Sequence, residues 1–349
     1  MLQELSIQDQ GQVKQWDRFV ESHPNGSPFH LSSWIYTLHK TYSFEPLLYA
    51  KKDRSGNISG VLPCFLVKSL ATGTRIVSLP FSDFAGPLFE SDTEEKQAIA
   101  ECIHRNKHRV KYIQIRSRFP QDSALVPHNY YKLHLLDLDF FRTEMNRTLQ
   151  KRTIQYSIRK AQKAGVEIRE ENSRKGLDTF CRLNNLTRSR QGIPCQPRQF
   201  FNNLYQYMLA KGRVSIMVAT SGSKALASTV LLKFKDTAYY KYNASDPRYL
   251  NSMTPNHLLT WHIIEGAYQR GCRFFDFGRT APDNPGLTRF KEMWGADPLD
   301  LPYYYYPDIK GVLAREESSL LYRSLTTAWR SFPEPLTRAM GALIYRHLA

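Results

Sequence analysis

The chain repeats one pattern of helices and strands in its two halves. From Leu47 to Ser69, LLYAKKDRSGNISGVLPCFLVKS has an apolar strand, a turn at Arg54-Ser55-Gly56-Asn57 and a longer apolar strand. From Val214 to Asp236, VSIMVATSGSKALASTVLLKFKD has the same order. Two amphipathic helical segments precede each copy. Because the same unit is present twice, the sequence predicts an α/β fold made of two similar mixed sheets flanked by helices.

The length of the chain agrees with this duplication. A chain of 349 residues suits about two domains. We expect a first domain over 1–145, a second over 146–310 and a C-terminal helical tail over 311–349 that packs on the first domain. Ser32 or Ser33 is expected to cap the helix that contains Trp34, and Thr254 the helix that begins at Pro255.

Composition narrows the compartment and the partners. The net charge of +16 favours anionic partners, which include nucleic acid, phosphorylated small molecules and an acidic membrane face. Five scattered cysteines without a C-x-x-C pair favour reduced thiols. The N-terminal segment MLQELSIQDQ lacks the features of a signal peptide, and no apolar run is long enough to span a bilayer. We therefore expect a cytoplasmic protein.

Several catalytic classes are excluded by missing motifs. The chain has no G-x-S-x-G elbow, no H-E-x-x-H pair and no Walker glycine loop. Its ten histidines show no spacing typical of metal ligands, and His257 and His262 are interpreted as polar helix positions. No metal site is predicted.

The segment DFGRTAPDNPGLTRFKEMWG, from Asp276 to Gly295, is the first candidate site. Asp276 ends an apolar strand, where functional carboxylates often lie in open α/β sheets. Adjacent helical positions point about a quarter-turn apart, so Phe290 can enter the core while Lys291 points elsewhere. An ammonium held in this way suits an oxyanion or a phosphate. The alternative is a surface lysine beside a core phenylalanine.

The segment YYKYNAS and the helix start after it form the second candidate. Tyr240, Tyr242 and Ser245 are expected to lie on one strand face that lines a cleft, the two tyrosines by the period of two. The alternative is a sheet face of buried rings. Free amides at the helix start near Asn256, together with Arg248, predict an anion site. The alternative there is an ordinary capped helix.

A strongly basic helix from Arg147 to Lys163 has two interpretations. Ile154 and Ile158 form a thin apolar stripe among its Arg and Lys residues. Such a helix is usually a solvated face, but it can also contact a polyanion.

Six motifs in order resemble the Fem family of peptidyltransferase-like proteins and their FemAB-like or BioF2-like acetyltransferase relatives. The motifs are SPFHLSSW (Ser27 to Trp34), LPFSDFAGPL (Leu79 to Leu88), SIRKAQKAGVEI (Ser157 to Ile168), RSRQGIP (Arg188 to Pro194), YYKYNAS with TPNHLLTW, and DFGRT…GLTRFKEMWGA. They cover nearly the whole chain.

The resemblance implies two tandem GNAT-like domains and acyl transfer to an amine. Fem enzymes move an aminoacyl group from charged tRNA to a peptidoglycan precursor, and the looser relatives are acyltransferases associated with polysaccharide biosynthesis. In the family, a Phe-Lys pair lies at the catalytic centre, and it matches Phe290 and Lys291 here. The CoA-binding turn of GNAT domains is rich in glycine, whereas Arg248 to Met253 contains none. No long charged helical hairpin of the kind found in some tRNA-using Fem proteins is visible either.

These observations predict an N-acyltransferase. It would move an acyl or aminoacyl group from acyl-CoA or aminoacyl-tRNA, as a co-substrate and not a tightly bound cofactor, to an amine of a cell-envelope or polysaccharide precursor. We expect Lys291 to stabilise the oxyanion or leaving group and Phe290 to orient it. Tyr242 and Asp276, which would line the cleft, are the other catalytic candidates. The candidates for substrate binding are Tyr240, Arg190, Arg248, Ser245, Asn256, Trp34 and, more weakly, Asp83 and Glu90.

Two other functions are open at this point. The positive charge also suits a polyanion-binding protein, for tRNA or other nucleic acid, that has a catalytically inactive GNAT fold. In addition, the basic amphipathic segment WRSFPEPLTRAMGALIYRHLA suits a peripheral enzyme at the inner face of the membrane that acts on a lipid-linked or nucleotide-linked acceptor.

Overall fold

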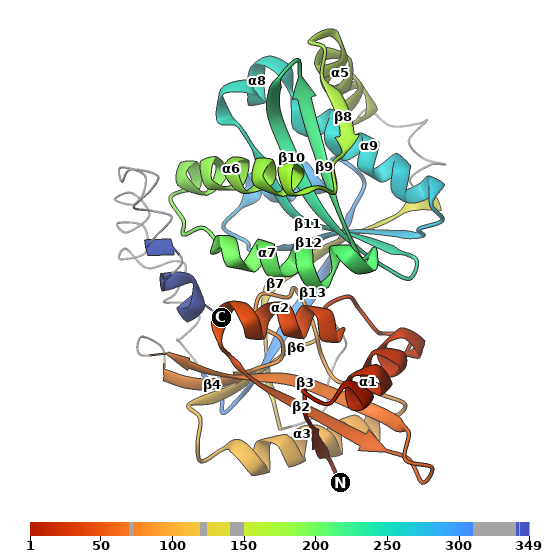
Figure 1. The fold of residues 1–349 in the computed structure, drawn as a ribbon, viewed down its shortest axis with the longest axis vertical. Coiled ribbons are helices and arrows are strands. Elements are labelled where there is room, and N and C mark those ends of the chain that lie inside the picture. Colours follow the sequence, from red (N-terminus) through yellow and green to blue (C-terminus); the bar gives the residue numbers. More distant parts are fainter. Residues whose placement is uncertain (70–72, 119–123, 140–149, 310–339, 342, 349) are drawn as a thin grey trace. The chain divides into compact units, whose positions relative to one another are not determined.

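The protein folds into two compact α/β units. The computed structural model describes residues 1–69, 73–118, 124–139, 150–309, 340–341 and 343–348. Unit 1 comprises Met1–Tyr131 with residues 300–309 and 343–348, and unit 2 comprises Lys132–Leu299 with residues 340–341 (Figure 1). Each unit has a mixed sheet flanked by helices, so the α/β class expected from the sequence is confirmed.

In unit 1, neighbouring strands of the sheet follow the order β1-β2-β3-β4-β6-β13, with β5 paired to β3. Strands β4 and β6 are parallel, and the other neighbours are antiparallel. The elements of this unit are β1 (Gln3–Leu5), α1 (Gln10–Ser22), α2 (Ser32–Tyr42), β2 (Glu45–Lys52), β3 (Ile58–Ser69), β4 (Gly73–Val77), β5 (Leu88–Phe89), α3 (Asp92–Asn106), β6 (Tyr112–Arg116), β13 (Asp297–Tyr306) and η3 (Arg346–Leu348).

Unit 2 contains a second sheet in the order β7-β12-β11-β10-β9-β8. Strands β11 and β12 are parallel, and the other neighbours are antiparallel. The elements are β7 (Val126–Asp137), α5 (Gln150–Lys163), β8 (Glu167–Glu170), α6 (Arg174–Gln191), α7 (Arg198–Tyr207), η1 (Leu209–Lys211), β9 (Val214–Ser221), β10 (Lys224–Phe234), β11 (Thr237–Ser245), η2 (Pro247–Tyr249), α8 (Leu250–Met253), α9 (Pro255–Gln269), β12 (Phe274–Thr280) and α10 (Pro285–Glu292).

The two units have the same element order, as the sequence repeat predicts. Strands β1, β2, β3, β4 and β6 of unit 1 correspond in order and pairing to β8, β9, β10, β11 and β12 of unit 2. Each sheet then receives its next strand from the other half of the sequence. Strand β13 pairs with β6, and the Lys132–Asp137 part of β7 pairs with β12. The sequence repeat did not show this exchange.

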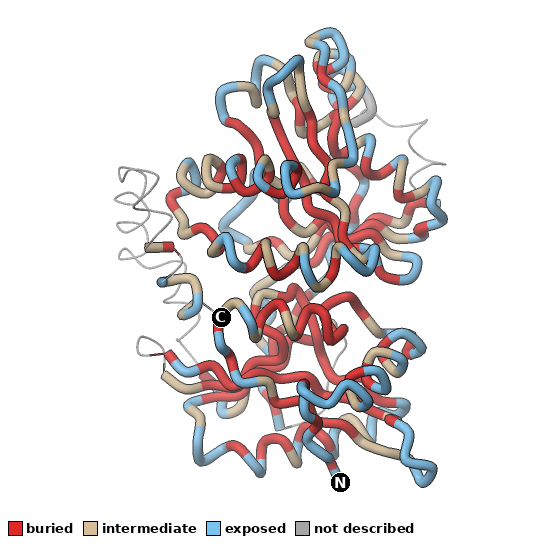
Figure 2. The backbone as a smooth tube through the Cα atoms, viewed as in Figure 1, coloured by how far each residue is buried: buried red, intermediate tan, exposed pale blue. Residues whose placement is uncertain are grey.

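Apolar strands form the core of each unit (Figure 2). In unit 2, one core cluster joins Phe275 and Phe277 of β12 to Leu259 and Ile263 of α9. Helix α6 packs on β10 and β11, and α9 packs on β9 and β10. In Figure 1, α6 and α7 cross in front of the strands of this unit. The amphipathic helices therefore cover apolar strands, as expected for a layered α/β fold.

Two helix starts differ from the sequence prediction. The backbone amide and hydroxyl of Ser32 bind the Asp17 carboxylate, at 2.7 and 2.6 Å, and no side chain caps α2. Thr254 stands at the cap position of α9, but its hydroxyl donates to the carbonyl of Ser157 on α5 at 2.7 Å. In both cases a tertiary partner replaces the local cap, so the predicted capping side chains are wrong.

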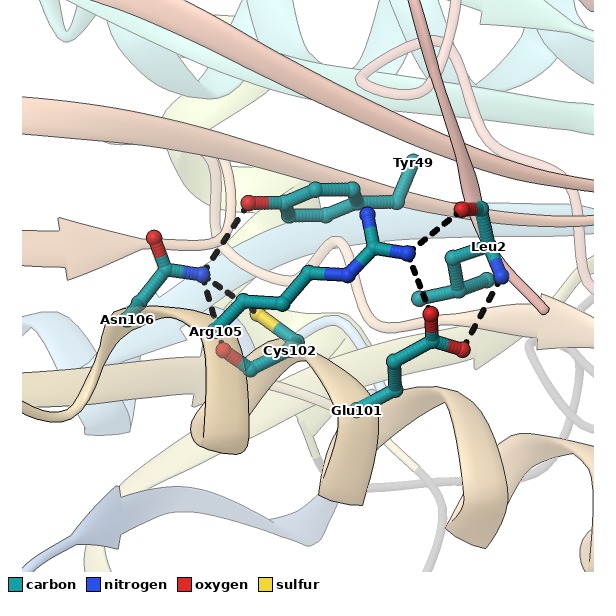
Figure 3. A network of polar contacts seen from close by, with 6 residues as sticks. All are labelled: Leu2, Tyr49, Glu101, Cys102, Arg105 and Asn106. Carbon is teal, nitrogen blue, oxygen red and sulfur yellow. Dashed lines mark hydrogen bonds and ion pairs between the residues drawn. The ribbon is translucent and has the colours of Figure 1, made fainter.

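A polar network attaches the N-terminal strand to α3 in unit 1 (Figure 3). Arg105 donates to the carbonyl of Leu2 at 2.7 Å and pairs with Glu101, which accepts from the amide of Leu2 at 2.9 Å. Asn106 donates to the hydroxyl of Tyr49 at 3.0 Å. Two of these contacts join segments about a hundred residues apart in sequence, so the network stabilises the fold of unit 1.

The end of the chain contacts unit 1. Tyr345 stacks against Tyr42 and lies 4.8 Å from the ring of Phe81, and His347 lies 2.9 Å from the hydroxyl of Ser69. The predicted tail covers 311–349, and residues 310–339 and the first residues of the predicted basic helix lie outside the described residues. Among the described helices, none is long and apolar enough to cross a membrane.

Candidate active site

Strands β11 and β12 diverge in the middle of the unit 2 sheet. They pair only where Thr237–Tyr239 faces Phe274–Asp276, although β11 continues to Ser245 and β12 to Thr280. Beyond this short parallel pairing the two strand ends have different neighbours, β10 for β11 and β7 for β12. Ligands of open α/β sheets bind at the carboxyl ends of strands that diverge in this way.

The Asp-Phe-Gly sequence builds a bulge at the diverging end of β12. Pairing with β7 shifts between Asp276 and Arg279. Gly278 has a φ of 74°, a left-handed conformation that glycine adopts at little cost, and its amide donates to the Asp276 carboxylate at 2.7 Å. Asp276 is buried, with only 2% of its surface exposed. Its carboxylate therefore supports the bulge.

Lys291 of α10 reaches the same end of β12. Its side chain is buried, and Nζ lies 2.7 Å from the carbonyl oxygen of Gly278, 3.0 Å from that of Arg279 and 2.8 Å from the hydroxyl of Thr280. An ammonium group has three N–H donors, and these three oxygens match them. The alternative of a surface lysine is excluded by this burial. Lys291 places a fixed positive charge where the strands diverge.

A buried histidine continues this contact. Nδ1 of His134, on β7, lies 3.2 Å from the Thr280 hydroxyl that also contacts Lys291. His134 is fully buried, and Nε2 has no hydrogen-bond partner among the described residues. Burial and the nearby charge of Lys291 lower the pKa of His134 to about 4, so the imidazole is neutral near neutral pH.

Phe290 packs against the first turn of α9. Its ring lies 5.8 Å from that of His257 and 6.2 Å from that of Trp294. Burial lowers the pKa of His257. Phe290, which is partly buried, and Trp294 thus pack α10 on unit 2 while the buried Lys291 points to β12.

Tyr240 and Tyr242 do not share a face. The register between β10 and β11 shifts at Val230/Leu231, which leaves Lys241 as an extra residue between the two tyrosines. The hydroxyl of Tyr240 lies 3.1 Å from that of Thr260 on α9, whereas the ring of Tyr242 packs 5.8 Å from that of Phe200 on α7. The expected common face is therefore wrong, because a bulge changes the alternation.

The predicted phosphate-binding residues lie around the end of β11. Arg248 pairs with the buried Asp246 carboxylate, at 2.6 Å and 3.0 Å, and the hydrogen bonds from Arg248 lower the pKa of Asp246. Ser245 is buried, and its backbone exchanges hydrogen bonds with the Thr187 hydroxyl. Arg190 is exposed at the end of α6. Asn256, in the first turn of α9, has a side-chain oxygen without a partner among the described residues.

The candidates of the first half lie in unit 1. Trp34 is fully buried and packs 5.2 Å from the ring of Phe29. The backbone carbonyl of Asp83 accepts a hydrogen bond from Tyr303 at 2.8 Å, and Glu90 is exposed. Trp34 and Asp83 therefore form part of the framework of unit 1.

Sequence reasoning missed His134 and Thr280. A single histidine in the apolar segment KLHLLD, from Lys132 to Asp137, resembles an ordinary buried residue. The pairing of β7 with β12 places it beside the bulge, and that pairing joins residues about 140 positions apart. Only the polar character of His134 in an apolar strand could have marked it.

The chemistry available here is electrostatic. Lys291 supplies a fixed charge. The first turn of α9 offers few amides to an anion, because Pro255 has no N–H group and the amide of His257 donates to the carbonyl of Thr254 at 3.2 Å. Among the described residues, no group of three or more His, Cys, Asp or Glu side chains is placed to hold a metal ion.

Comparison with known proteins agrees with this geometry. Residues 149–292 match the model of the acetyltransferase (GNAT) domain. A lipid II:glycine glycyltransferase of Staphylococcus haemolyticus (strain JCSC1435) is 21% identical over 378 aligned positions, which cover 80% of this chain and 87% of that protein. The crystal structure of FemX superposes with a TM-score of 0.66 at 18% identity, over 88% of this chain and 97% of FemX. A tandem GNAT protein from the clavulanic acid pathway gives 0.55 at 12% identity, over 87% and 97%.

The diverging strands and these matches define the class. The protein is an acyltransferase with tandem GNAT-like domains. Within that class it is similar to the lipid II:glycine glycyltransferases and to FemX, in agreement with the resemblance expected from its six motifs.

Proposed function

We propose that the protein is an N-acyltransferase that uses the diverging end of β11 and β12 in unit 2. It transfers an acyl or aminoacyl group from an activated donor, acyl-CoA or aminoacyl-tRNA, to an amine of a lipid-linked or nucleotide-linked precursor of the cell envelope. The proposal rests above all on one observation, the buried Lys291 ammonium fixed at that strand end.

The relatives support the choice of substrate class. The similar staphylococcal enzymes are named lipid II:glycine glycyltransferases, and the similarity extends over 80% of this chain. A lipid-linked acceptor requires the enzyme to work at the membrane, so we propose a cytoplasmic location at its inner face. The net charge of +16 favours approach to an anionic surface and to phosphate-bearing substrates.

The reaction needs positioning and charge stabilisation. The acceptor amine attacks the donor carbonyl, a tetrahedral oxyanion forms, and the thiol or ribose hydroxyl of the donor leaves. The positive charge of Lys291 stabilises the oxyanion in a buried setting. Its N–H groups already contact three oxygens, so it acts through its charge.

The donor phosphates have a candidate binding region. Arg248, just after the end of β11, is exposed, although Asp246 neutralises part of its charge, and Asn256 lies in the first turn of α9. The connection from Arg248 to Met253 contains no glycine. Both donors are therefore tested.

The experiment is a transfer assay read by mass spectrometry. The purified protein is incubated with acetyl-CoA, or with tRNA charged with glycine, and with lipid II or its nucleotide precursor. We expect a product heavier by one acyl or glycyl group with one donor, and about a hundredfold less product with Lys291→Met. A product that forms equally fast with Lys291→Met contradicts the role of this residue.

The competing function is polyanion binding without catalysis. It predicts tight binding of tRNA with a steep dependence on salt and no product with either donor. The same preparations distinguish the two, because acyl transfer gives a covalent product and binding alone does not.

A further inference from the structure

A chain of three buried side chains leads away from the diverging strands of unit 2. Lys291 on α10 contacts the hydroxyl of Thr280 on β12 at 2.8 Å, and this hydroxyl contacts Nδ1 of His134 on β7 at 3.2 Å. His134, Thr280 and Lys291 are each at most 3% exposed. The chain crosses three elements, so its members are brought together only by the folded unit.

The direction of these hydrogen bonds follows from the donors. An ammonium group can only donate, so the Thr280 oxygen accepts from Lys291. The single hydroxyl proton of Thr280 is then available for Nδ1 of His134, which accepts it in the tautomer that carries its proton on Nε2. A neutral imidazole that accepts at Nδ1 carries its proton on Nε2.

This arrangement leaves one hydrogen-bond donor of His134 unsatisfied. The Nε2–H group is buried and has no partner among the described residues. Buried polar groups are nearly always satisfied, and an apolar ring of similar size would avoid the unsatisfied donor. The retained imidazole is therefore explained by what Nδ1 does, namely to accept from Thr280.

We propose that His134 is a positioning residue for Lys291. By accepting from Thr280, it turns the lone pairs of the hydroxyl toward the ammonium and so holds Lys291 in place at the diverging strands. Two of the three Lys291 acceptors are backbone carbonyls, which the bulge fixes. Of these three acceptors, the Thr280 hydroxyl can rotate, and His134 sets the direction in which it points.

The kinetic arm of the test rests on the proposed transfer activity. Thr280→Val removes the hydroxyl and keeps the shape, and it is expected to lower kcat by about 10- to 100-fold with little change in KM. Thr280→Ser keeps the hydroxyl and is expected to stay within about threefold of the wild type. If the Thr280 hydroxyl had only a structural role, Thr280→Val and Thr280→Ser of equal thermal stability would have the same kcat.

A second matched pair addresses His134. The amide of His134→Asn can reach the place of Nδ1 and accept from Thr280, whereas that of His134→Gln reaches the place of Nε2. We expect the asparagine variant to retain more of kcat than the glutamine variant. His134→Phe is expected to lose kcat while its melting temperature stays unchanged or rises, because the unsatisfied donor is removed.

A spectroscopic arm does not depend on transfer. The nitrogen chemical shifts of a ¹⁵N-histidine-labelled protein are expected to show His134 with its proton on Nε2, and Thr280→Val is expected to remove the hydrogen-bond shift at Nδ1. If the wild type transfers nothing, the proposed function fails, and this arm still tests the hydrogen bonds that join Lys291, Thr280 and His134. A proton on Nδ1 in the wild type overturns the inference. If the wild type is active, kcat values of Thr280→Val and His134→Phe that equal the wild-type value also overturn it.

Discussion

At the residue scale, Lys291 shows how a charge is kept inside the protein. The ammonium is buried, and the oxygens of Gly278, Arg279 and Thr280 surround it at 2.7–3.0 Å. A buried charge is costly unless hydrogen bonds replace its water. Three converging acceptors do so, and they leave the positive charge available to an oxyanion nearby.

Replacement of Lys291 is expected to affect catalysis strongly. Lys291→Met should lower kcat by about a hundredfold or more, because the charge at the diverging strands is lost. Lys291→Arg should not restore it, since a planar guanidinium does not match three acceptors that converge on one point. Steady-state kinetics of the folded variants measure this. Arg270→Met is the control: Arg270 is exposed and pairs with Glu170 at 3.1 Å, and its loss should leave kcat unchanged.

The stability of the protein should depend on the neutral state of His134. Its pKa is lowered to about 4 from an ordinary value of 6.5, so the unfolded chain binds a proton that the folded protein does not. Stability is therefore complete above the unfolded pKa and falls as pH drops from about 6.5 to about 4. Burial of His257 acts in the same direction.

Denaturant unfolding between about pH 7 and about pH 4.5 measures this dependence. His134→Phe should show a smaller loss of unfolding free energy across the window than the wild type. Equal pH dependence in the two proteins would show that His134 does not contribute.

The residues of the site were predictable only in part from the sequence. Phe290 and Lys291 could be named because adjacent helical positions point in different directions. His134 could not, because its role depends on a strand pairing between distant residues. The common face of Tyr240 and Tyr242 was predicted wrongly, since one extra residue in a strand is invisible to a period of two.

At the scale of elements, the bulge in β12 orients the carbonyls that hold Lys291. Gly278 has a φ of 74°, and the Asp276 carboxylate accepts from its amide at 2.7 Å. An alanine at such a φ is strained, so Gly278→Ala should destabilise the protein by about 1–2 kcal/mol. It should also lower kcat, because the carbonyls of Gly278 and Arg279 move away from Nζ.

Gly286 is the matched control for this substitution. It lies in α10, with an ordinary backbone conformation and open space around the place of an added Cβ. Gly286→Ala should therefore leave kcat unchanged and stabilise the helix by up to about 1 kcal/mol. Thermal unfolding and kinetics of both variants test the pair, and equal effects of the two substitutions would contradict a role for the bulge.

Element types were more accessible to the sequence than element ends. Apolar runs and turn residues predicted the strands β2, β3, β9 and β10 and the turns between them. The predicted caps at Ser32 and Thr254 failed, because Asp17 and the carbonyl of Ser157 bind these side chains instead. Local rules fail where a distant group offers a better partner.

At the scale of the whole molecule, the duplication is combined with an exchange of strands. The repeat predicted two similar units, and both have the same strand order. Yet β13, which follows the second copy in sequence, completes the sheet of unit 1, and the end of β7, which follows the first, completes that of unit 2. A sequence repeat records similarity between segments and contains no information about which strands pair across it.

This exchange predicts that each unit is stabilised by residues of the other half of the chain. Tyr304 of β13 is 3% exposed and belongs to the core of unit 1, and Leu136 of β7 is 1% exposed and belongs to the core of unit 2. Tyr304→Ala and Leu136→Ala each create a cavity and should lower the free energy of unfolding by about 3 kcal/mol.

Hydrogen exchange then locates the loss of stability, because amides exchange faster in the unit that is weakened. Tyr304→Ala should accelerate exchange in β6 and β4, about 190 and about 230 residues earlier in the chain, and Leu136→Ala should accelerate it in β11 and β12. If amide exchange became faster only near each substitution in sequence, β13 and the end of β7 would contribute little to the units that they join. Faster exchange in the distant strands instead follows directly from the pairing of β13 with β6 and of β7 with β12.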